Sequence, residues 1–245
     1  LGQTDGTSNR IIATNQNVIA SMKEDIRKTN RNNITTRSYV TVDFLKHFTA
    51  TANYAYDYRA SRSLTYYTPT VGDGQSFNGR GTKGAGFASV TNFNQLLSYD
   101  NQWGKHTLNL MAGHEYYKYI YDSQSGQKTN FFDLTNPQPD NGGSIQYFIG
   151  SNYSHVMEGY FLKGDYNYAN KYYLSANVRR DGTSRFHPDH RWGTFWSVGG
   201  SWRIAQEKFM ESAEWVNELK LRASYGTQGN ENVLSSTSYN SYVLY

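Results

Sequence analysis

Apolar and polar residues alternate along several stretches of this chain, and no other feature restricts the fold more. In the stretch HFTATANYAYDYR, the even positions from Phe48 to Tyr58 are apolar or aromatic, and the odd positions are polar with one exception. The stretches YFLKGDYNY and YYLSANVRR repeat the pattern. Successive side chains of a β-strand point to opposite faces, so the alternation predicts strands with one apolar and one polar face.

The spacing of these stretches predicts an all-β, antiparallel fold. Strands are expected near residues 34–43, 47–59, 87–99, 105–121, 159–168, 171–181, 191–204 and 218–227. The segment RIIATNQNVIASM and the tail STSYNSYVLY are candidates for further strands, giving nine or ten in all, whereas KEDIRKTNRNN is expected to be a polar loop. The AQEKFMESAEW segment is expected to form a helical turn.

The lengths of the connections distinguish between classes of β protein. Short connections at 44–46, 100–104 and 169–170 alternate with long ones at 60–86 and 122–158. Outer-membrane β-barrels are built in this way, with short periplasmic turns and long extracellular loops. The sequence therefore predicts an antiparallel transmembrane β-barrel in the outer membrane and in contact with its lipid.

Composition agrees with strands that have only one apolar face. Hydrophobic residues make up only 37% of the 245 residues, yet aromatic residues reach 16%, with 22 tyrosines. Disordered chains are poor in aromatic residues, whereas transmembrane strands collect Tyr and Trp at the membrane interfaces. Charged and polar residues of the alternating stretches are expected to face the lumen: Lys163, Asp165, Asn177, Arg179, Lys220 and Arg222.

Several other classes of protein are excluded by what the sequence lacks. It has no apolar run of the ~18 residues that a transmembrane helix needs, and no cysteine for a disulfide, thiol nucleophile or cysteine-based metal site. The opening LGQTDGTSNR has no signal-peptide core, so we expect either a removed signal or an internal piece of a longer protein. The net charge of +4 is dispersed, and no nucleic-acid partner is expected.

The motifs that suggest chemistry do not fit their surroundings. GRGTKG matches a dinucleotide-binding pattern but lies in a Gly/Ser/Asn-rich loop rather than between a strand and a helix. His187 and His190 flank Asp189, but Pro188 prevents the helical spacing of a metal pair. The sequence therefore predicts no catalytic, cofactor or metal site, and no enzyme.

Two groups of loop residues remain as candidates. Long loops carry Tyr66, Tyr67, Phe131 and Phe132, whose rings could stack on sugars or peptide side chains, or could pack on one another to close the loops. The stretch RRDGTSRFHPDHRWGTF is expected to form a tight polar loop. An ion-pair network within it would hold the loop in one shape and consists of Asp181, Arg185, Asp189 and Arg191.

Longer pieces of the sequence resemble a known family. These are NYANKYYLSANVRRDGTSRF, RWGTFWSVGGSWRI, EKFM and LKLRASYGTQGN, with YDNQWGKHTLNLMAGHE upstream. Together they resemble the C-terminal half of the barrel in SusC/RagA-type TonB-dependent outer-membrane transporters of Gram-negative bacteria.

The resemblance implies a barrel of about 22 strands with a plug, energised through TonB, that imports oligosaccharides or peptides beneath a SusD-like lipoprotein lid. Against that pattern, residues 1–245 are expected to be one barrel segment without a plug domain or a TonB-contacting N-terminal region, hence a fragment or a truncated gene product.

Two other functions stay open on the sequence alone. A small autonomous outer-membrane barrel of eight or ten strands could serve a structural or adhesive role. A soluble carbohydrate-binding β-sandwich would also show alternating strands.

Overall fold

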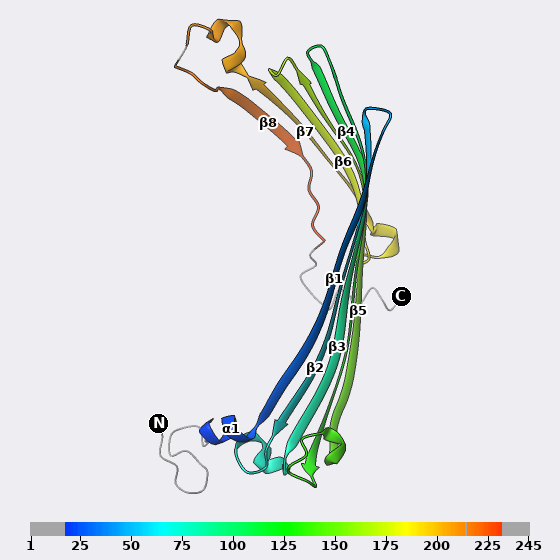
Figure 1. The fold of residues 1–245 in the computed structure, drawn as a ribbon, viewed down its shortest axis with the longest axis vertical. Helices are drawn as coiled ribbons and strands as arrows, with labels where there is room; N and C mark the ends of the chain where they lie inside the picture. The colour runs from blue at the N-terminus through cyan, green and yellow to red at the C-terminus, as the bar shows by residue number, and fades with distance from the viewer. Residues whose placement is uncertain (1–17, 214, 232–245) are drawn as a thin grey trace. The chain divides into compact units, whose positions relative to one another are not determined.

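The described residues form one sheet whose strands follow one another in chain order. The computed structural model describes residues 18–213 and 215–231, and within them eight strands lie side by side in the order β1 to β8 (Figure 1). The pairs β5–β6, β6–β7 and β7–β8 are antiparallel. The strands are β1 Ile26–Phe44, β2 Phe48–Tyr67, β3 Arg80–Trp103, β4 His106–Phe131, β5 Gly142–Tyr168, β6 Tyr172–Thr183, β7 Trp192–Arg203 and β8 Lys220–Gly226.

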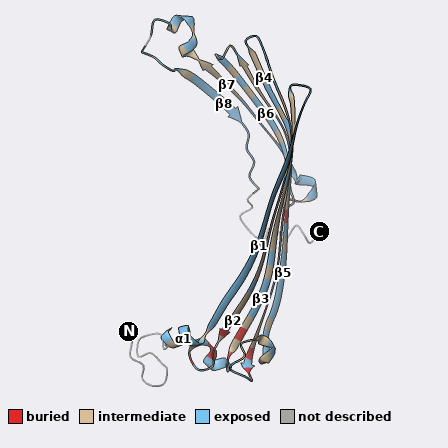
Figure 2. Cartoon of the chain, in the orientation of Figure 1, coloured by how far each residue is buried: buried red, intermediate tan, exposed pale blue. Residues whose placement is uncertain are grey.

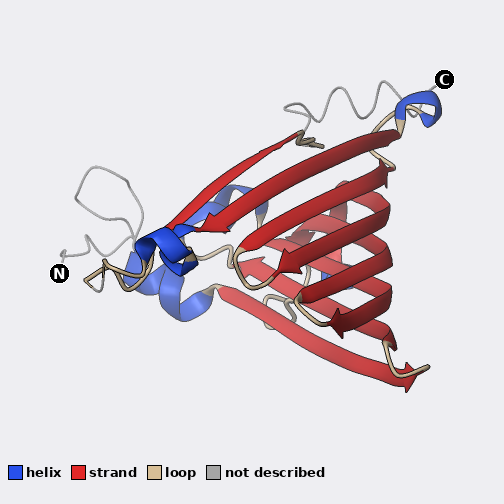
Figure 3. Ribbon diagram, turned by 90° about the horizontal axis from the view of Figure 1, so that it is seen from above, coloured by secondary structure: helices blue, strands red, loops and turns tan. Residues whose placement is uncertain are grey.

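Helical segments are short and lie between or before the strands (Figure 3). They are the α-helix α1 Val18–Glu24 and the 3₁₀ helices η1 Gly72–Phe77, η2 Pro139–Asn141, η3 Pro188–His190, η4 Ile204–Gln206 and η5 Lys208–Met210. Among the described residues, no helix has the length and apolar character needed to cross a membrane. The helical turn expected in AQEKFMESAEW corresponds to η4 and η5.

A tight turn sets the pairing of β5 with β6. Ala169 and Asn170 both have positive φ, 55° and 57°, and the Lys171 amide donates to the Tyr168 carbonyl at 3.0 Å. Two consecutive residues in the left-handed region form the turn whose twist matches that of antiparallel strands. The ladder runs from Tyr168 opposite Tyr172 to Met157 opposite Thr183.

The chain divides into two compact units. The first unit comprises residues 1–35, 57–89 and 120–154, and the second comprises 36–56, 90–119 and 155–245. Strands β1 to β5 contribute residues to both units, whereas β6, β7 and β8 belong to the second.

Within the described ranges, the fully buried apolar side chains lie in the first unit. Tyr66, Val71 and Phe131 are each at most 3% exposed to solvent. The rings of Tyr66 and Phe131 pack edge to face with their centres 4.9 Å apart. Phe131 ends β4, Tyr66 is the last residue but one of β2, and Val71 follows in the connection; Figure 2 shows buried positions in red at this end of the strands. Glycine makes the close packing there achievable, since a Cβ at Gly81 would lie 2.4 Å from the Phe131 ring.

In the second unit the register separates two faces of the sheet. One face carries aromatic and aliphatic side chains, with Tyr160, Trp192 and Arg180 in contact and Tyr172 stacked on Trp202 at 6.5 Å. The polar residues predicted to share a face do so. Lys163 of β5 lies opposite Asn177 of β6. Tyr173, on the same face of β6 as Asn177, lies opposite Ser201 of β7, which in turn lies opposite Arg222 of β8. The predicted alternation is thus confirmed.

The strands are longer than the sequence pattern predicts. Five of them have 19 to 27 residues, where the expected ranges, 34–43, 47–59, 87–99, 105–121 and 159–168, are 10 to 17 residues long. The strands extend into the two long loops that were expected at 60–86 and 122–158. The connections that remain are residues 68–79 and 132–141. Serine and glycine take many positions in these extensions, for example Ser61, Gly84 and Ser125, so the apolar period fades although the strands continue.

The N-terminal predictions are corrected in the same way. The segment KEDIRKTNRNN was expected to be a loop, but from Ile26 onward it forms the start of β1, and its first two residues end α1. Val18 to Met22, expected as part of a strand, lie in α1. The rest of RIIATNQNVIASM and the tail STSYNSYVLY lie outside the described residues, so eight of the nine or ten expected strands are described.

Candidate functional site

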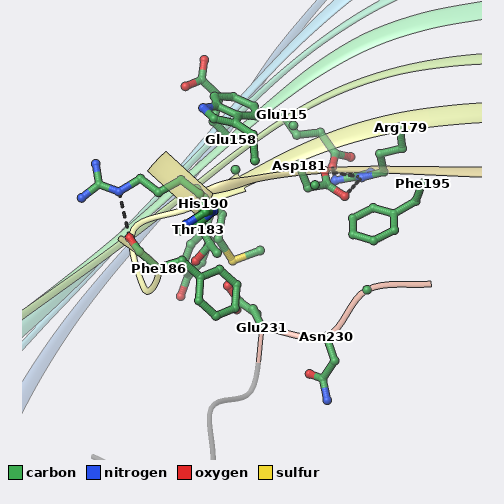
Figure 4. Close-up of a pocket in the computed structure, with 18 residues that line it drawn as sticks. Glu115, Glu158, Arg179, Asp181, Thr183, Phe186, His190, Phe195, Asn230 and Glu231 are labelled. Carbon is green, nitrogen blue, oxygen red and sulfur yellow. Dashed lines mark hydrogen bonds and ion pairs between the residues drawn. The ribbon is translucent and has the colours of Figure 1, made fainter. Parts of the chain in front are cut away.

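The second unit brings ionic groups together around Arg179 on the polar face of β6 (Figure 4). The Arg179 Nε donates to both carboxylate oxygens of Asp181, at 2.6 and 2.8 Å, and its Nη2 donates to Glu115 Oε2 of β4 at 2.5 Å. The guanidinium also lies 5.7 Å from the centre of the Phe161 ring. A planar group with several fixed donors suits this arrangement, in which two carboxylates and a ring face hold one cation.

The strand register explains why Arg179 has these neighbours. Arg179 lies opposite Phe161 of β5 and Phe195 of β7, and Asp181 lies opposite Gly159. A Cβ at Gly159 would lie 2.4 Å from Asp181 Oδ1 and 2.9 Å from Arg179 Nη2. Glycine at position 159 therefore leaves the space in which the ion pair forms.

A second polar group lies next to the first. His155 is 5% exposed, and its Nε2 is 3.2 Å from Glu231 Oε2 and 3.3 Å from Thr183 Oγ1. The Tyr117 ring meets His155 edge to face at 5.9 Å, and Arg185 Nη1 is 3.5 Å from Glu231 Oε1. These contacts hold the chain after β8 against the β6–β7 connection.

A cavity of about 280 Å³ is lined by the Arg179 group and, from the second group, by Tyr117, Thr183 and Glu231. Its wall combines charged side chains, including Glu115, Arg179 and Glu231, with the rings of Phe186 and Phe195. Hydrogen-bonding groups next to aromatic rings suit the non-covalent binding of a polar ligand. No cluster of potential metal ligands occurs among the described residues.

The four residues expected to form the loop network have different partners in the structure. Asp181 pairs with Arg179, Arg185 with Glu231, and Asp189 with His187 at 3.3 Å. Arg191 donates from Nε to the Phe186 carbonyl at 3.1 Å, which closes the loop by a side-chain contact with the backbone. The role of this loop as a clamp stays a prediction.

The aromatic residues predicted to bind substrate lie together at the loop end of the first unit but differ in exposure. Tyr66 and Phe131 are buried against one another. Tyr67 is covered by Arg80 and Arg27, whose guanidinium carbons lie 4.6 and 5.3 Å from the ring centre. Phe132 is 81% exposed and is the member of the group most available to a ligand. Substrate binding by these residues stays a prediction.

Glu115, His155 and Glu231 were not predicted as site residues. Glu115 is 64 residues from Arg179, and Glu231 is 76 residues from His155, so no local spacing connects them. Only Glu115 lies in a piece that carries the family resemblance, YDNQWGKHTLNLMAGHE, and nothing in the sequence connects it with the other two.

Comparison with known proteins identifies the family of the chain. The family described as "TonB dependent receptor-like, beta-barrel" matches residues 2–243. The chain belongs to this family. It is therefore a segment of an outer-membrane β-barrel, in a family of receptors rather than of enzymes.

Relatives of this TonB-dependent receptor segment confirm the resemblance to the SusC/RagA type. TonB-dependent receptor P39 of Formosa agariphila is 27% identical over 239 residues, which cover 94% of this chain and 22% of that protein. TonB-dependent receptor SusC of Bacteroides thetaiotaomicron is 24% identical over 228 residues, covering 91% of the chain and 22% of that protein. The segment thus spans about a fifth of the length of these relatives.

Solved structures show the same fold. The RagAB peptide transporter matches with a TM-score of 0.82 at 22% identity, over 94% of this chain and 26% of that one. The RagAB peptide importer in its closed-closed state matches with a TM-score of 0.79 at 24% identity, over 85% of this chain and 24% of that one. The predicted antiparallel barrel, partial in this chain, is confirmed.

Proposed function

We propose that this chain is a barrel segment of a longer outer-membrane importer of the SusC/RagA type, which takes up oligosaccharides or peptides with energy supplied through TonB. The observation that carries the proposal is the family match over residues 2–243. The relative SusC and the fold match with the RagAB peptide importer support it. In this proposal residues 1–245 are one barrel segment, and the plug and the TonB-contacting region belong to other parts of the protein.

The two faces of the sheet would have different surroundings in the importer. In an outer-membrane barrel the apolar face contacts lipid and the polar face lines the interior. Lys163, Asn177 and Arg222 would then hydrate the pathway, and transport would involve no covalent step. A SusD-like lipoprotein would cover the extracellular end, near the loops that carry Phe132.

The cavity beside Arg179 would contact the cargo on its way through. Phe186 and Phe195 offer ring faces to sugars or to peptide side chains. Glu115, Arg179 and Glu231 offer acceptors and donors to hydroxyl, amide and terminal groups. Mixed contacts of this kind bind a polar solute and still permit release, as uptake requires.

The other functions considered receive less support. A β-sandwich needs two packed sheets, whereas the strands among the described residues form one sheet. A small autonomous barrel would leave unexplained why the chain matches about a fifth of each larger relative.

The proposal is tested by uptake in cells that express the complete receptor carrying this segment. Radiolabelled oligosaccharide and peptide mixtures should accumulate in cells with an intact TonB system and should remain outside when the TonB gene is deleted. The double substitution Glu115→Gln and Phe195→Ala should reduce uptake, with Asp165→Asn as a control on the same face. Equal accumulation with and without TonB would contradict the proposal.

A further inference from the structure

A groove in the first unit collects three positive charges on one face of the sheet. Arg62 of β2, Lys83 of β3 and Lys128 of β4 line a groove of about 850 Å³, together with the Phe148 ring of β5. The Phe148 side chain is 73% exposed, and Gly126 lies beside it without a side chain of its own. Three strands thus place a cation each around an open, partly apolar hollow.

These three charges are poorly balanced by acidic groups. Within the described part of the chain, no ion pair joins Arg62, Lys83 or Lys128 to a carboxylate, and Lys83 Nζ instead donates to Gln138 Oε1 at 2.8 Å. One carboxylate, Asp140, also lines the groove. Like charges held close together repel one another, so an anion in the groove would relieve the repulsion and be attracted by all three.

The cations share their face with apolar residues. In β2, Tyr58 and Arg62 lie four residues apart, and in β3, Lys83 and Phe87 do so, which puts each pair on one face of its strand. The opposite face carries serine and glycine: Ser123 and Ser151 hydroxyls are 3.0 Å apart, and the Ser61 hydroxyl donates to the Gly86 carbonyl at 3.2 Å. One face of the unit is therefore apolar with a group of cations, and the other is small and polar.

We propose that the groove binds the phosphate group of an anionic lipid headgroup. Apolar side chains followed along a strand by lysine and arginine match the order of acyl chain and headgroup at a membrane surface. Phosphate oxygens accept hydrogen bonds from ammonium and guanidinium groups at once, and the exposed Phe148 ring contacts the apolar part of the lipid. This site goes beyond solute uptake, because its ligand is a membrane component rather than cargo.

The test measures lipid binding by the complete receptor, purified in a neutral detergent. Native mass spectrometry with titrated phosphatidic acid, and with phosphatidylcholine of the same acyl chains, gives the two affinities. In the variant Arg62→Gln, Lys83→Gln, Lys128→Gln we expect the affinity for phosphatidic acid to fall roughly 100-fold, since each basic residue near a lipid surface contributes about a factor of five. Phosphatidylcholine binding should not change.

A matched control removes the same charge elsewhere. Lys46, Lys105 and Lys208 lie in connections of the second unit, and their combined replacement by Gln should leave the affinity for phosphatidic acid unchanged. If the triple groove variant does not fold, the single substitution Lys128→Gln should still lower the affinity about fivefold. Cargo uptake by either folded variant should equal that of the unaltered receptor, so that failure here is distinguishable from failure of the importer proposal.

An unchanged affinity for phosphatidic acid in a folded groove variant would overturn the lipid assignment. If that same variant lost binding of a soluble sulfated oligosaccharide, used as a second probe, the groove would be a site for acidic sugars instead.

Discussion

Arg179 connects three strands through its side chain alone. It pairs with Asp181 on its own strand, with Glu115 on β4, and lies over the Phe161 ring of β5. The arginine and Asp181 side chains each retain 35% exposure, so water screens the pair in part but does not separate it. The single Nε–H group shares its hydrogen bond between the two carboxylate oxygens of Asp181, and the charges on both partners make this contact stronger than one between neutral groups.

Removal of the Asp181 carboxylate should weaken the barrel wall. We expect Asp181→Ala to lower the free energy of unfolding by about 1 kcal/mol, because Arg179 loses a charge-assisted contact and keeps only Glu115. The loss should appear as reduced assembly and heat resistance of the folded receptor on gels, and cargo affinity should change less.

Asp165→Ala provides the matched control for Asp181→Ala. Asp165 pairs with Lys163 at 2.8 Å, but both side chains are more than 40% exposed. Pairs of that kind contribute between about 0 and 1 kcal/mol to the free energy of unfolding, so Asp165→Ala should change assembly little.

Normal assembly of the Asp181→Ala receptor together with lost cargo binding would contradict the stabilising role and assign Asp181 to the substrate site.

Glu207 stabilises the ends of two strands from the connection after β7. Its carboxylate accepts hydrogen bonds from the Tyr172 hydroxyl at 2.6 Å and the Trp202 indole at 3.0 Å, and pairs with Lys171 at 3.2 Å. Hydrogen bonds from Tyr172 and then Trp202 lower the pKa of Glu207 from 4.5 to about 2. The beginning of β6 and the end of β7 are thus held by one ionised side chain.

The depressed pKa predicts an acid-sensitive contact. The stabilisation is complete above about pH 4.5 and is lost as the pH falls toward 2, because the folded form must then take up a proton that its contacts oppose. We expect the Glu207→Gln receptor to be less heat-resistant than the unaltered receptor at pH 7. Its heat resistance should also fall by less when the pH is lowered to 2. Glu211→Gln, which alters an exposed carboxylate in the same connection, should keep the original pH profile. Parallel pH profiles for the unaltered receptor and Glu207→Gln would contradict this role.

The elements differ in how well the sequence predicts them. Strands β6 and β7 follow the pattern closely, because they are only 12 residues long and alternate throughout. The parts of β2 to β5 in the first unit were missed, since residues such as Ser61, Gly84 and Ser125 give no apolar period. The Arg179 cluster could be predicted only in part, because its partners come from other strands and depend on register.

On the scale of the whole molecule, the described sheet has two ends. Its order places β1 first and β8 last, so within the described residues each has one edge without a strand partner. Exposed backbone donors and acceptors at such edges are costly in lipid. Membrane insertion therefore favours a larger barrel, in agreement with relatives that are several times longer than this chain.

The central claim is that one face of this sheet contacts lipid and the other lines a hydrated interior. The chain has no cysteine, so single cysteines can be introduced at positions 174 to 178 of β6 in the complete receptor, with any cysteine elsewhere replaced. Spin labels at these positions, in receptor reconstituted into lipid vesicles, report access to oxygen from lipid and to a nickel chelate from water. Positions 174, 176 and 178 should be accessible to oxygen, and 175 and 177 to nickel. Equal nickel access at all five positions would contradict the account.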